Sequence, residues 1–189
     1  MLRLQWVAPH APEMARLYAL RHEVFVLEQR VPVELERDDH DLTADHLAAW
    51  REEDGRLVGV LRMLEWEADE AVAPSLLCAV LSDGSGAVPP PQAGEGWGTS
   101  ACGLTARPAG SGRVAKIGRV AVPQDMRGRG FAAAMMREAL ERARSQGFDE
   151  AYLHAQWDAR GLYERLGFVP EGDTFDDAGI LHIAMRRRL

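Results

Sequence analysis

The sequence contains few cysteines, no long apolar run and no excess of basic charge. Cys78 and Cys102 are its only cysteines, which argues against the disulfide framework of a small secreted domain. We expect two incidental thiols, with a local bridge or a shared metal as the alternative. No apolar stretch approaches the roughly 20 residues that cross a bilayer, and a formal net charge of -7 disfavours nucleic acid as a partner. The sequence therefore predicts neither a membrane nor a nucleic-acid partner.

The N-terminal residues lack the basic and then apolar pattern of a secretory leader, so a cytoplasmic location is expected. The only basic run, residues 186–188, is interpreted as a solvated strand end. A chain of 189 residues that is 47% hydrophobic is long enough to bury the core of one domain. We therefore expect a single domain over residues 1–189.

Hydrophobic periodicity predicts a mixture of strands and helices. Alternating apolar residues predict strands over 2–8, 46–50, 56–64, 113–122, 151–155 and 180–185, with another strand starting at Phe168. Near-helical spacing predicts helices from Pro12 to residues 25–29, from Phe131 to Gln146 and over residues 157–166. This order of elements favours an α/β (α+β) domain with a mixed sheet and helices on its faces, and disfavours a regular doubly wound fold.

Two segments interrupt this pattern. Residues 66–112 are rich in proline, glycine and alanine and hold few large apolar residues, so we interpret them as an insertion that leaves the sheet and forms no core of its own. Residues 34–45 are acidic and predict a loop with about one helical turn. Its carboxylates, Asp38, Asp39 and Asp41 among them, either attract a cationic group or are solvated.

The most informative segment runs from residue 116 to residue 132. A β-branched run leads into a glycine-and-arginine turn, and a long amphipathic helix follows directly. Such a helix N-terminus presents unpaired N–H groups and the positive end of the helix dipole, which suits a phosphate or pyrophosphate group. Gly128 and Gly130 let the backbone approach an anion, and Arg127 and Arg129 add positive charge. The third glycine of a dinucleotide-binding turn and the Gly-Lys-Ser/Thr of a P-loop are both absent.

The turn Arg127-x-x-Gly130-x-Ala132 resembles the pyrophosphate-binding turn of the GCN5-related N-acetyltransferases, the GNAT superfamily. Further along the chain, residues 162–168, which include Tyr163 and end in Gly167-Phe168, look like the tyrosine and Gly-Phe ending of that superfamily. A narrower resemblance to its ElaA-like branch covers nearly all of the chain outside 66–112. The matching positions are residues 20–29, Asp38, Asp41, His46, Ala155, Gln156 and residues 177–185.

The chain departs from the ElaA-like branch in two places. The 66–112 insertion replaces what would be a short connection. Near the end, where the branch usually shows Glu-Asp-Gly-Ile-Pro-His, this chain carries Asp177, Ala178 and Leu181. Both departures bear on the identity of the acceptor more than on the binding of the cofactor.

The resemblance implies a GNAT-like mixed, mostly antiparallel sheet with helices on both faces, and acetyl-CoA (acetyl-coenzyme A) as donor. Its pyrophosphate would bind the turn, and its pantetheine arm would pair with the backbone of the preceding strand. Gln156 would either contact that arm or cap the following helix. The cofactor-binding residues implied are Val120, Val122, Arg127, Gly128, Arg129, Gly130, Phe131, Ala132 and Gln156.

Tyr163 matches the tyrosine that protonates the leaving thiolate in this superfamily, and a phenol with a pKa of about 10 suits that task. The alternative is an aromatic ring that packs the helix onto the sheet. An amine must lose a proton before it attacks, and the candidate bases are Glu28, His46, His154 and His182. Glu28 is preferred because it closes the helix expected beside the acceptor. For each histidine taken singly, a hydrogen-bonded core role is favoured over the role of base.

The resemblance further implies Phe25, Gln29 and His182 as acceptor residues, and no ligand spacing indicates a metal. We expect an acetyl-CoA-dependent N-acetyltransferase that acts by direct transfer to a primary amine, because neither cysteine lies in the motif region. The alternatives are an acyl-homoserine-lactone synthase-like acyltransferase and a non-catalytic acyl-CoA-binding module. The acceptor stays open among small-molecule and peptide amines, and the oligomeric state, a homodimer included, stays open too.

Overall fold

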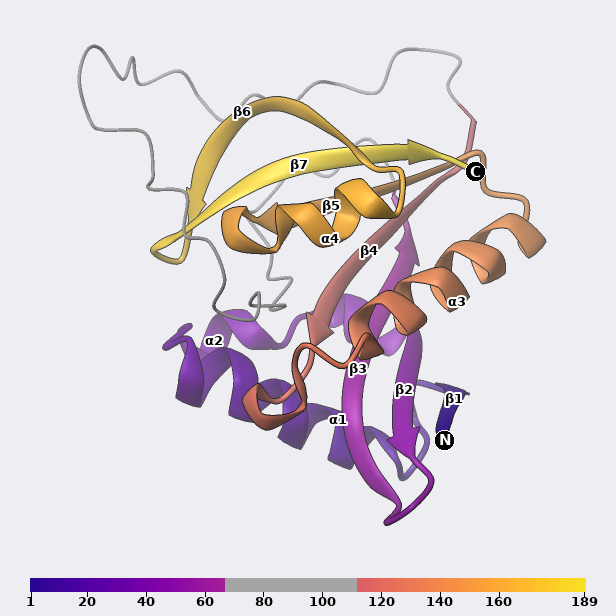
Figure 1. The fold of residues 1–189 in the computed structure, drawn as a ribbon, viewed down its shortest axis with the longest axis vertical. Helices are drawn as coiled ribbons and strands as arrows, with labels where there is room; N and C mark the ends of the chain where they lie inside the picture. The colour runs from indigo at the N-terminus through magenta and orange to yellow at the C-terminus, as the bar shows by residue number, and fades with distance from the viewer. Residues whose placement is uncertain (67–111) are drawn as a thin grey trace.

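The computed structural model describes residues 1–66 and 112–189, which form one seven-stranded sheet with helices on both faces (Figure 1). The predicted insertion, apart from its end residues 66 and 112, lies outside these described residues, as do Cys78 and Cys102. The strands are β1 (Leu2–Val7), β2 (Asp45–Arg51), β3 (Arg56–Glu65), β4 (Val114–Ala121), β5 (Glu150–Gln156), β6 (Val169–Asp177) and β7 (Ile180–Arg188). No helix within the described ranges is both long and apolar enough to cross a bilayer.

The strands lie in the order β1-β2-β3-β4-β5-β7-β6. Every neighbouring pair is antiparallel except β4 and β5, which run parallel. The prediction of a mixed, mostly antiparallel sheet is therefore confirmed. The single parallel pair follows from the crossover between β4 and β5, which passes through a 3-10 turn, η3 (Gln124–Met126), and a helix, α3 (Phe131–Ser145).

Helices cover the sheet from both sides and divide its interior into two cores. On one face, α3 buries Met135, Met136 and Ala139 against the central strands. The same core extends beneath a 3-10 turn, η4 (Trp157–Ala159), and a short helix, α4 (Arg160–Arg165). On the other face, α1 (Met14–Arg21) and the π-helix η1 (His22–Glu28) bury Leu17 and Phe25 against β2 and β3. Figure 1 shows α1 and α3 on opposite sides of β3.

Strand β4 contains a bulge that reverses which of its residues face each core. Between Val60 and Arg62 the partner residues step from Ala121 to Gly118, so β4 carries one extra residue. Arg119 lies within this bulge at φ 52, a left-handed conformation that non-glycine residues rarely adopt. As a result, Ile117 and Val120 both face the α3 side although their sequence spacing is odd.

The observed elements correct several predicted boundaries. The first helix begins at Met14, beyond Pro12, and its second half is a π-helix, which the sequence did not predict. The acidic segment forms two short turns, α2 (Val33–Glu36) and the 3-10 turn η2 (Asp39–Leu42). Strand β7 extends to Arg188, and Arg186 pairs with Glu150 and Glu171, each at 2.9 Å. Arg186 is therefore a paired sheet residue and not a solvated strand end.

Candidate active site

Strands β4 and β5 pair over only three residues and then separate. Residues 114–116 of β4 pair with residues 150–152 of β5. Beyond that point β4 remains paired with β3, and β5 remains paired with β7. Among the described residues, the later part of β4 (residues 117–121) therefore forms no ladder with the later part of β5 (residues 153–156). Unpaired N–H and C=O groups along such an edge suit an extended ligand that carries amides.

The glycine-and-arginine turn lies directly after β4 and leads into α3. Gly128 and Gly130 have positive φ angles of 72° and 79°, and Gly130 is the N-cap residue of the helix. The amide of Ala134 donates to the carbonyl of Gly130 at 3.0 Å, so the preceding N–H groups of the first turn have no acceptor inside the helix. A Cβ built on Gly130 meets no heavy atom within 4 Å. The turn thus combines outward amides with open space, and these features fit a pyrophosphate group.

Arg127 does not point freely from this turn. Its Nη1 and Nη2 donate to the two carboxylate oxygens of Glu28 at 2.6 and 2.7 Å, and its Nε donates to the carbonyl of Val122 at 3.1 Å. The structure thereby joins the predicted phosphate residue to the predicted base. Arg129 has an exposed side chain whose Nη2 donates to the carbonyl of Asp125 at 3.2 Å. Of the two arginines, Arg129 is the one accessible to an anion.

The other residues predicted to bind the cofactor lie at or beside the opening between β4 and β5. The side chains of Val120 and Val122 are buried in the α3-side core, so only their backbone groups remain for a ligand. Gln156, at the end of β5, donates from Nε2 to Oε1 of Gln29 at 3.1 Å. This contact brings a predicted cofactor residue and a predicted acceptor residue together across the end of η1. Phe25, also predicted at the acceptor, is fully buried in the α1-side core.

Tyr163 lies on α4 with 0% of its surface exposed. Its ring meets Phe168 edge-on at a centroid distance of 6.1 Å, within the α3-side core. The Tyr163 ring therefore does pack α4 onto the sheet, which was one of the two roles expected from the sequence. The role as an acid requires contact with the reacting sulfur and stays a prediction.

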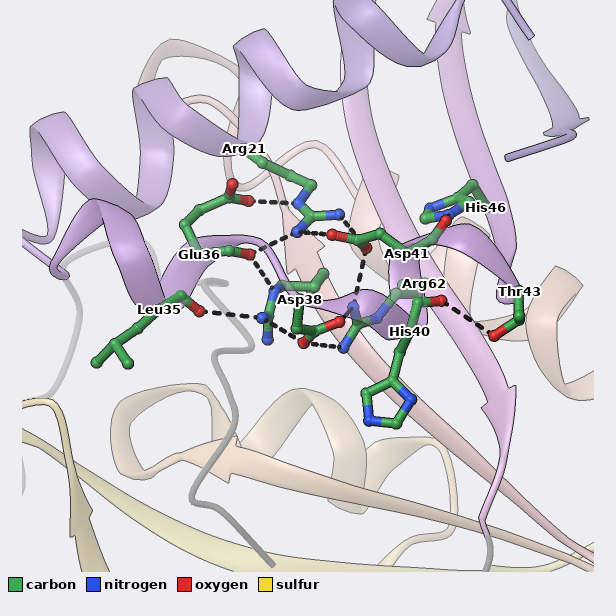
Figure 2. A network of polar contacts seen from close by, with 10 residues as sticks. Arg21, Leu35, Glu36, Asp38, His40, Asp41, Thr43, His46 and Arg62 are labelled. Atoms are coloured by element: carbon green, nitrogen blue, oxygen red, sulfur yellow. Dashed lines mark hydrogen bonds and ion pairs between the residues drawn. The ribbon is translucent and has the colours of Figure 1, made fainter. Parts of the chain in front are cut away.

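A buried network of ion pairs joins the end of α1, α2 and η2 to the sheet (Figure 2). Three guanidinium groups, of Arg21, Arg62 and Arg119, face three carboxylates, of Glu36, Asp38 and Asp41. Asp41 accepts from Arg21 at 2.7 and 3.0 Å and from Arg62 at 2.8 Å. Asp38 accepts from Arg62 and Arg119. The formal charges of the network balance, so the carboxylates of Asp38 and Asp41 are already paired with arginines and attract a further cation only weakly.

Burial sets the protonation behaviour of this network. Burial alone would raise the pKa of Asp41, but the hydrogen bonds and charges of Arg21 and Arg62 outweigh it and hold the pKa well below its usual value. Burial, reinforced by the neighbouring charges of Arg62 and Arg21, lowers the pKa of Arg119 to about 9. The network therefore connects the end of α1 to β3 and β4 through charged groups whose positive and negative charges balance.

The three candidate histidines have different surroundings. His46 Nε2 bonds to the carbonyl of Asp41 at 2.9 Å, and burial lowers the pKa of the ring. His154 Nε2 bonds to the hydroxyl of Tyr152 at 2.9 Å. Burial, aided by the charges of Lys116 and His182, lowers the pKa of His154 to about 3. His182 bonds through Nδ1 to the carbonyl of Ile180 at 2.8 Å.

Sequence reasoning did not identify two charged residues near the opening. Arg119 is buried, and among the described residues its Nη1 has no hydrogen-bond partner. Asp177 is 3% exposed, and its Oδ2 likewise has no partner within residues 1–66 and 112–189. Neither belongs to a local motif, because the β4 bulge positions Arg119 and the pairing of β6 with β7 positions Asp177.

Comparison with known proteins agrees with this geometry. Residues 20–138 match a family model described as an acetyltransferase (GNAT) domain, and residues 101–189 match a second model of the same description. Over 194 residues the chain is 27% identical to Protein ElaA of Escherichia coli, covering 98% of this chain and 97% of that protein. The crystal structure of E. coli ElaA is similar at a TM-score of 0.68 and 24% identity, with 99% of each chain covered.

Two further solved structures share the fold. An acyl-CoA N-acyltransferase from Pseudomonas aeruginosa has a TM-score of 0.66 and 29% identity, with 99% of each chain covered. A Bacillus subtilis acetyltransferase solved in complex with CoA has a TM-score of 0.55 and 16% identity, covering 100% of this chain and 99% of that one. The resemblance inferred from the sequence motifs is thus confirmed: the chain belongs to the GNAT acetyltransferase family, and within that family it is similar to ElaA.

Proposed function

We propose that this enzyme transfers an acetyl group from acetyl-CoA to a primary amine by direct attack. The observation that carries the proposal is the separation of β4 and β5 beyond residue 116, next to a glycine turn at the N-terminus of α3. The unpaired strand edge can pair with the amide-bearing arm of the donor. The outward amides of the turn can bind its pyrophosphate.

Acetyl-CoA supplies an activated thioester with an electrophilic carbonyl carbon. The amides of Gly128, Arg129, Gly130, Phe131 and Ala132 would hold its pyrophosphate, with Arg127 and Arg129 adding positive charge. The backbone of Val120 and Val122 would pair with the arm, and the Gln156 side chain would contact it. A backbone N–H of β4 would also stabilise negative charge that develops on the carbonyl oxygen.

Tyr163 would complete the chemistry as the acid. The amine first gives one proton to a base, and its lone pair then forms the C–N bond to the acetyl carbon. As the C–S bond breaks, its electron pair goes to sulfur, which takes the phenolic proton of Tyr163. The new amide nitrogen gives its second proton back to the Tyr163 oxygen, and the base releases its proton to water. Products are the acetylated amine and free coenzyme A.

The acceptor is proposed to be a small-molecule or peptide amine bound near Phe25, Gln29 and His182. Glu28 is the base that the sequence favoured. Both of its oxygens accept from Arg127, so Glu28 would be free to contact the amine only after Arg127 turns toward the pyrophosphate.

Calorimetry and a thiol-release assay over a panel of primary amines test this function. The double variant Arg127→Ala, Arg129→Ala should weaken acetyl-CoA binding by a few kcal/mol, as expected for charge-assisted hydrogen bonds to phosphate. Arg137→Ala, which removes an exposed arginine further along α3, is the matched control and should leave the affinity unchanged. Equal affinities for the double variant and the control would refute the pyrophosphate assignment.

Tyr163→Phe separates the reaction from binding. It should lower turnover by about 100-fold or more while the dissociation constant of acetyl-CoA stays the same. Equal rates would remove the acid role. Acetyl-CoA binding without turnover of any amine would instead favour the non-catalytic acyl-CoA-binding module. Turnover of acyl carrier protein with S-adenosylmethionine would favour the lactone synthase.

A further inference from the structure

Strands β5, β6 and β7 share one polar face beside the opening between β4 and β5. The register opposes Gln156 to His182 and His182 to Phe175. Asp177 of β6 lies opposite Ile180 of β7, two positions along each strand from the Phe175–His182 pair. Directly opposed residues point to the same side of a sheet, and side chains two positions apart share that side. Gln156, Phe175, Asp177 and His182 therefore all project from one face, opposite to the face that packs against α3.

Two of these side chains carry buried polar atoms without a partner. His182 is 0% exposed and Asp177 is 3% exposed. Among the residues that the structure describes, neither Nε2 of His182 nor Oδ2 of Asp177 has a hydrogen-bond partner. An unsatisfied buried acceptor costs roughly 1–3 kcal/mol. Two of them on neighbouring positions of one hairpin indicate a ligand that brings hydrogen-bond donors.

The tautomer of His182 follows from its other nitrogen. Nδ1 lies 2.8 Å from the carbonyl oxygen of Ile180, which can only accept, so Nδ1 carries the proton. In the neutral ring Nε2 then holds a free lone pair and can accept a proton. His154 also has one bonded ring nitrogen, Nε2 to the hydroxyl of Tyr152, and one without a partner among the described residues, Nδ1. It differs from His182 in that burial lowers its pKa to about 3, which makes it a weak base.

Asp177 and His182 are placed to bind one small cation together. They are diagonal neighbours on one face of the β6–β7 hairpin, a separation of roughly 7–8 Å between backbones. Burial raises the pKa of Asp177, while the nearby His182 and the charges of Arg119 and Lys116 lower it to a smaller extent. Burial lowers the pKa of His182. An ammonium group would restore a counter-charge to Asp177 and offers three donors.

We propose that Asp177 and His182 form the binding site for the acceptor's primary ammonium group. Oδ2 of Asp177 accepts one of its N–H bonds, and Nε2 of His182 takes the proton that must leave before the amine attacks. His182 becomes an imidazolium and later releases this proton to water. The nitrogen lone pair forms the C–N bond, and the C–S electron pair goes to sulfur, which takes the phenolic proton of Tyr163. The new amide nitrogen then returns its second proton to the Tyr163 oxygen. This assignment rests on the proposed acetyl transfer, and it names His182 in place of Glu28 as the base.

The site adjoins the rest of the candidate machinery. His182 is paired in the sheet with Gln156, and Gln156 bonds to Gln29 at the end of η1. An amine held by the hairpin would therefore lie next to the predicted acceptor residue Gln29 and beside the end of β5, where β4 and β5 are apart. The acceptor class is a cationic primary amine, and a neutral alcohol of the same shape would leave Asp177 without a counter-charge.

The test compares Asp177→Asn and His182→Gln with Asp173→Asn, which removes an exposed carboxylate from the same strand. Steady-state rates are measured with acetyl-CoA and a panel of 1,4-diaminobutane, phenethylamine and L-lysine, and each variant's acetyl-CoA affinity is measured by calorimetry. We expect Asp177→Asn to raise KM for the amine at least ten-fold and His182→Gln to lower kcat about 100-fold. Acetyl-CoA affinity stays unchanged in both, and Asp173→Asn stays within two-fold of the wild type.

A second measurement needs no variant, so it does not depend on whether a variant folds. In the wild-type protein labelled at histidine, the amine that is turned over should shift the His182 ring resonances, and the corresponding alcohol should not. Absence of that shift, or full activity of Asp177→Asn or His182→Gln, would overturn the inference while leaving the proposed function intact. Failure of the wild type to bind acetyl-CoA or to acetylate any amine would instead remove the proposed function itself.

Discussion

Replacing Asp41 by asparagine would unbalance the buried ion-pair network. Asp41 is 3% exposed and accepts three contacts from Arg21 and Arg62 at 2.7, 2.8 and 3.0 Å. The substitution leaves three buried guanidinium groups facing two carboxylates. Breaking a buried ion pair from one side costs about 3–5 kcal/mol, which is a large share of the 5–15 kcal/mol by which a typical domain is stable. We expect a loss of that size in urea denaturation at pH 7.

Asp39→Asn is the matched control, because Asp39 is exposed two residues away, and it should change stability by no more than about 0.5 kcal/mol. The pKa of Asp41 is held below its unfolded value of about 3.9. Its contribution is therefore fully present above pH 4 and is lost as the pH falls toward the folded pKa. The difference between wild type and Asp41→Asn should shrink in that acidic range. A loss under about 1 kcal/mol at pH 7 would refute the argument that this network anchors the end of α1.

Two other predictions concern single contacts. Because burial lowers the pKa of His154 to about 3, its ring should remain neutral at pH 5. In the unfolded chain the ring gains a proton below about pH 6.5. The wild type should therefore lose roughly 2 kcal/mol of stability between pH 7 and pH 5, and His154→Gln should not show this loss. An NMR signal of His154 that titrates near pH 6.5 would contradict this prediction. Glu28→Gln removes the negative charge that pairs with Arg127. The Arg127 guanidinium would then be available to the phosphate without competition from a carboxylate, and coenzyme A should bind several-fold more tightly in calorimetry. Unchanged affinity would mean that Arg127 does not reach the phosphate.

The elements that the sequence predicted well are those defined by local pattern. Strong alternation gave the central strands to within a few residues, and the glycine turn was found because its residues are contiguous. Strand β6 was predicted only at its start, because Glu171, Gly172 and Asp173 interrupt the apolar pattern that marks a strand. Their burial is partial or slight, so no core constrains them to be apolar.

The parts that escaped sequence reasoning depend on pairings between distant segments. Arg21, Arg62 and Arg119 stand far apart in sequence, and only the sheet and the β4 bulge bring them to the same carboxylates. The free lone pair of His182 likewise depends on which nitrogen meets a backbone carbonyl. Neither spacing nor composition carries this information, since both arise from register and side-chain rotamer.

The distribution of charge also bears on where the proposed cationic acceptor would be attracted. The chain has a net charge of -7, and its densest acidic segment, residues 34–45, lies near the end of η1. Asp38 and Asp41 in that segment are neutralised by arginine, so they add little to the field at short range. Among the described residues, Asp177 is the buried carboxylate with an oxygen that no donor reaches. Under the proposal above, Asp177 and not the buried network would attract the ammonium group of the acceptor.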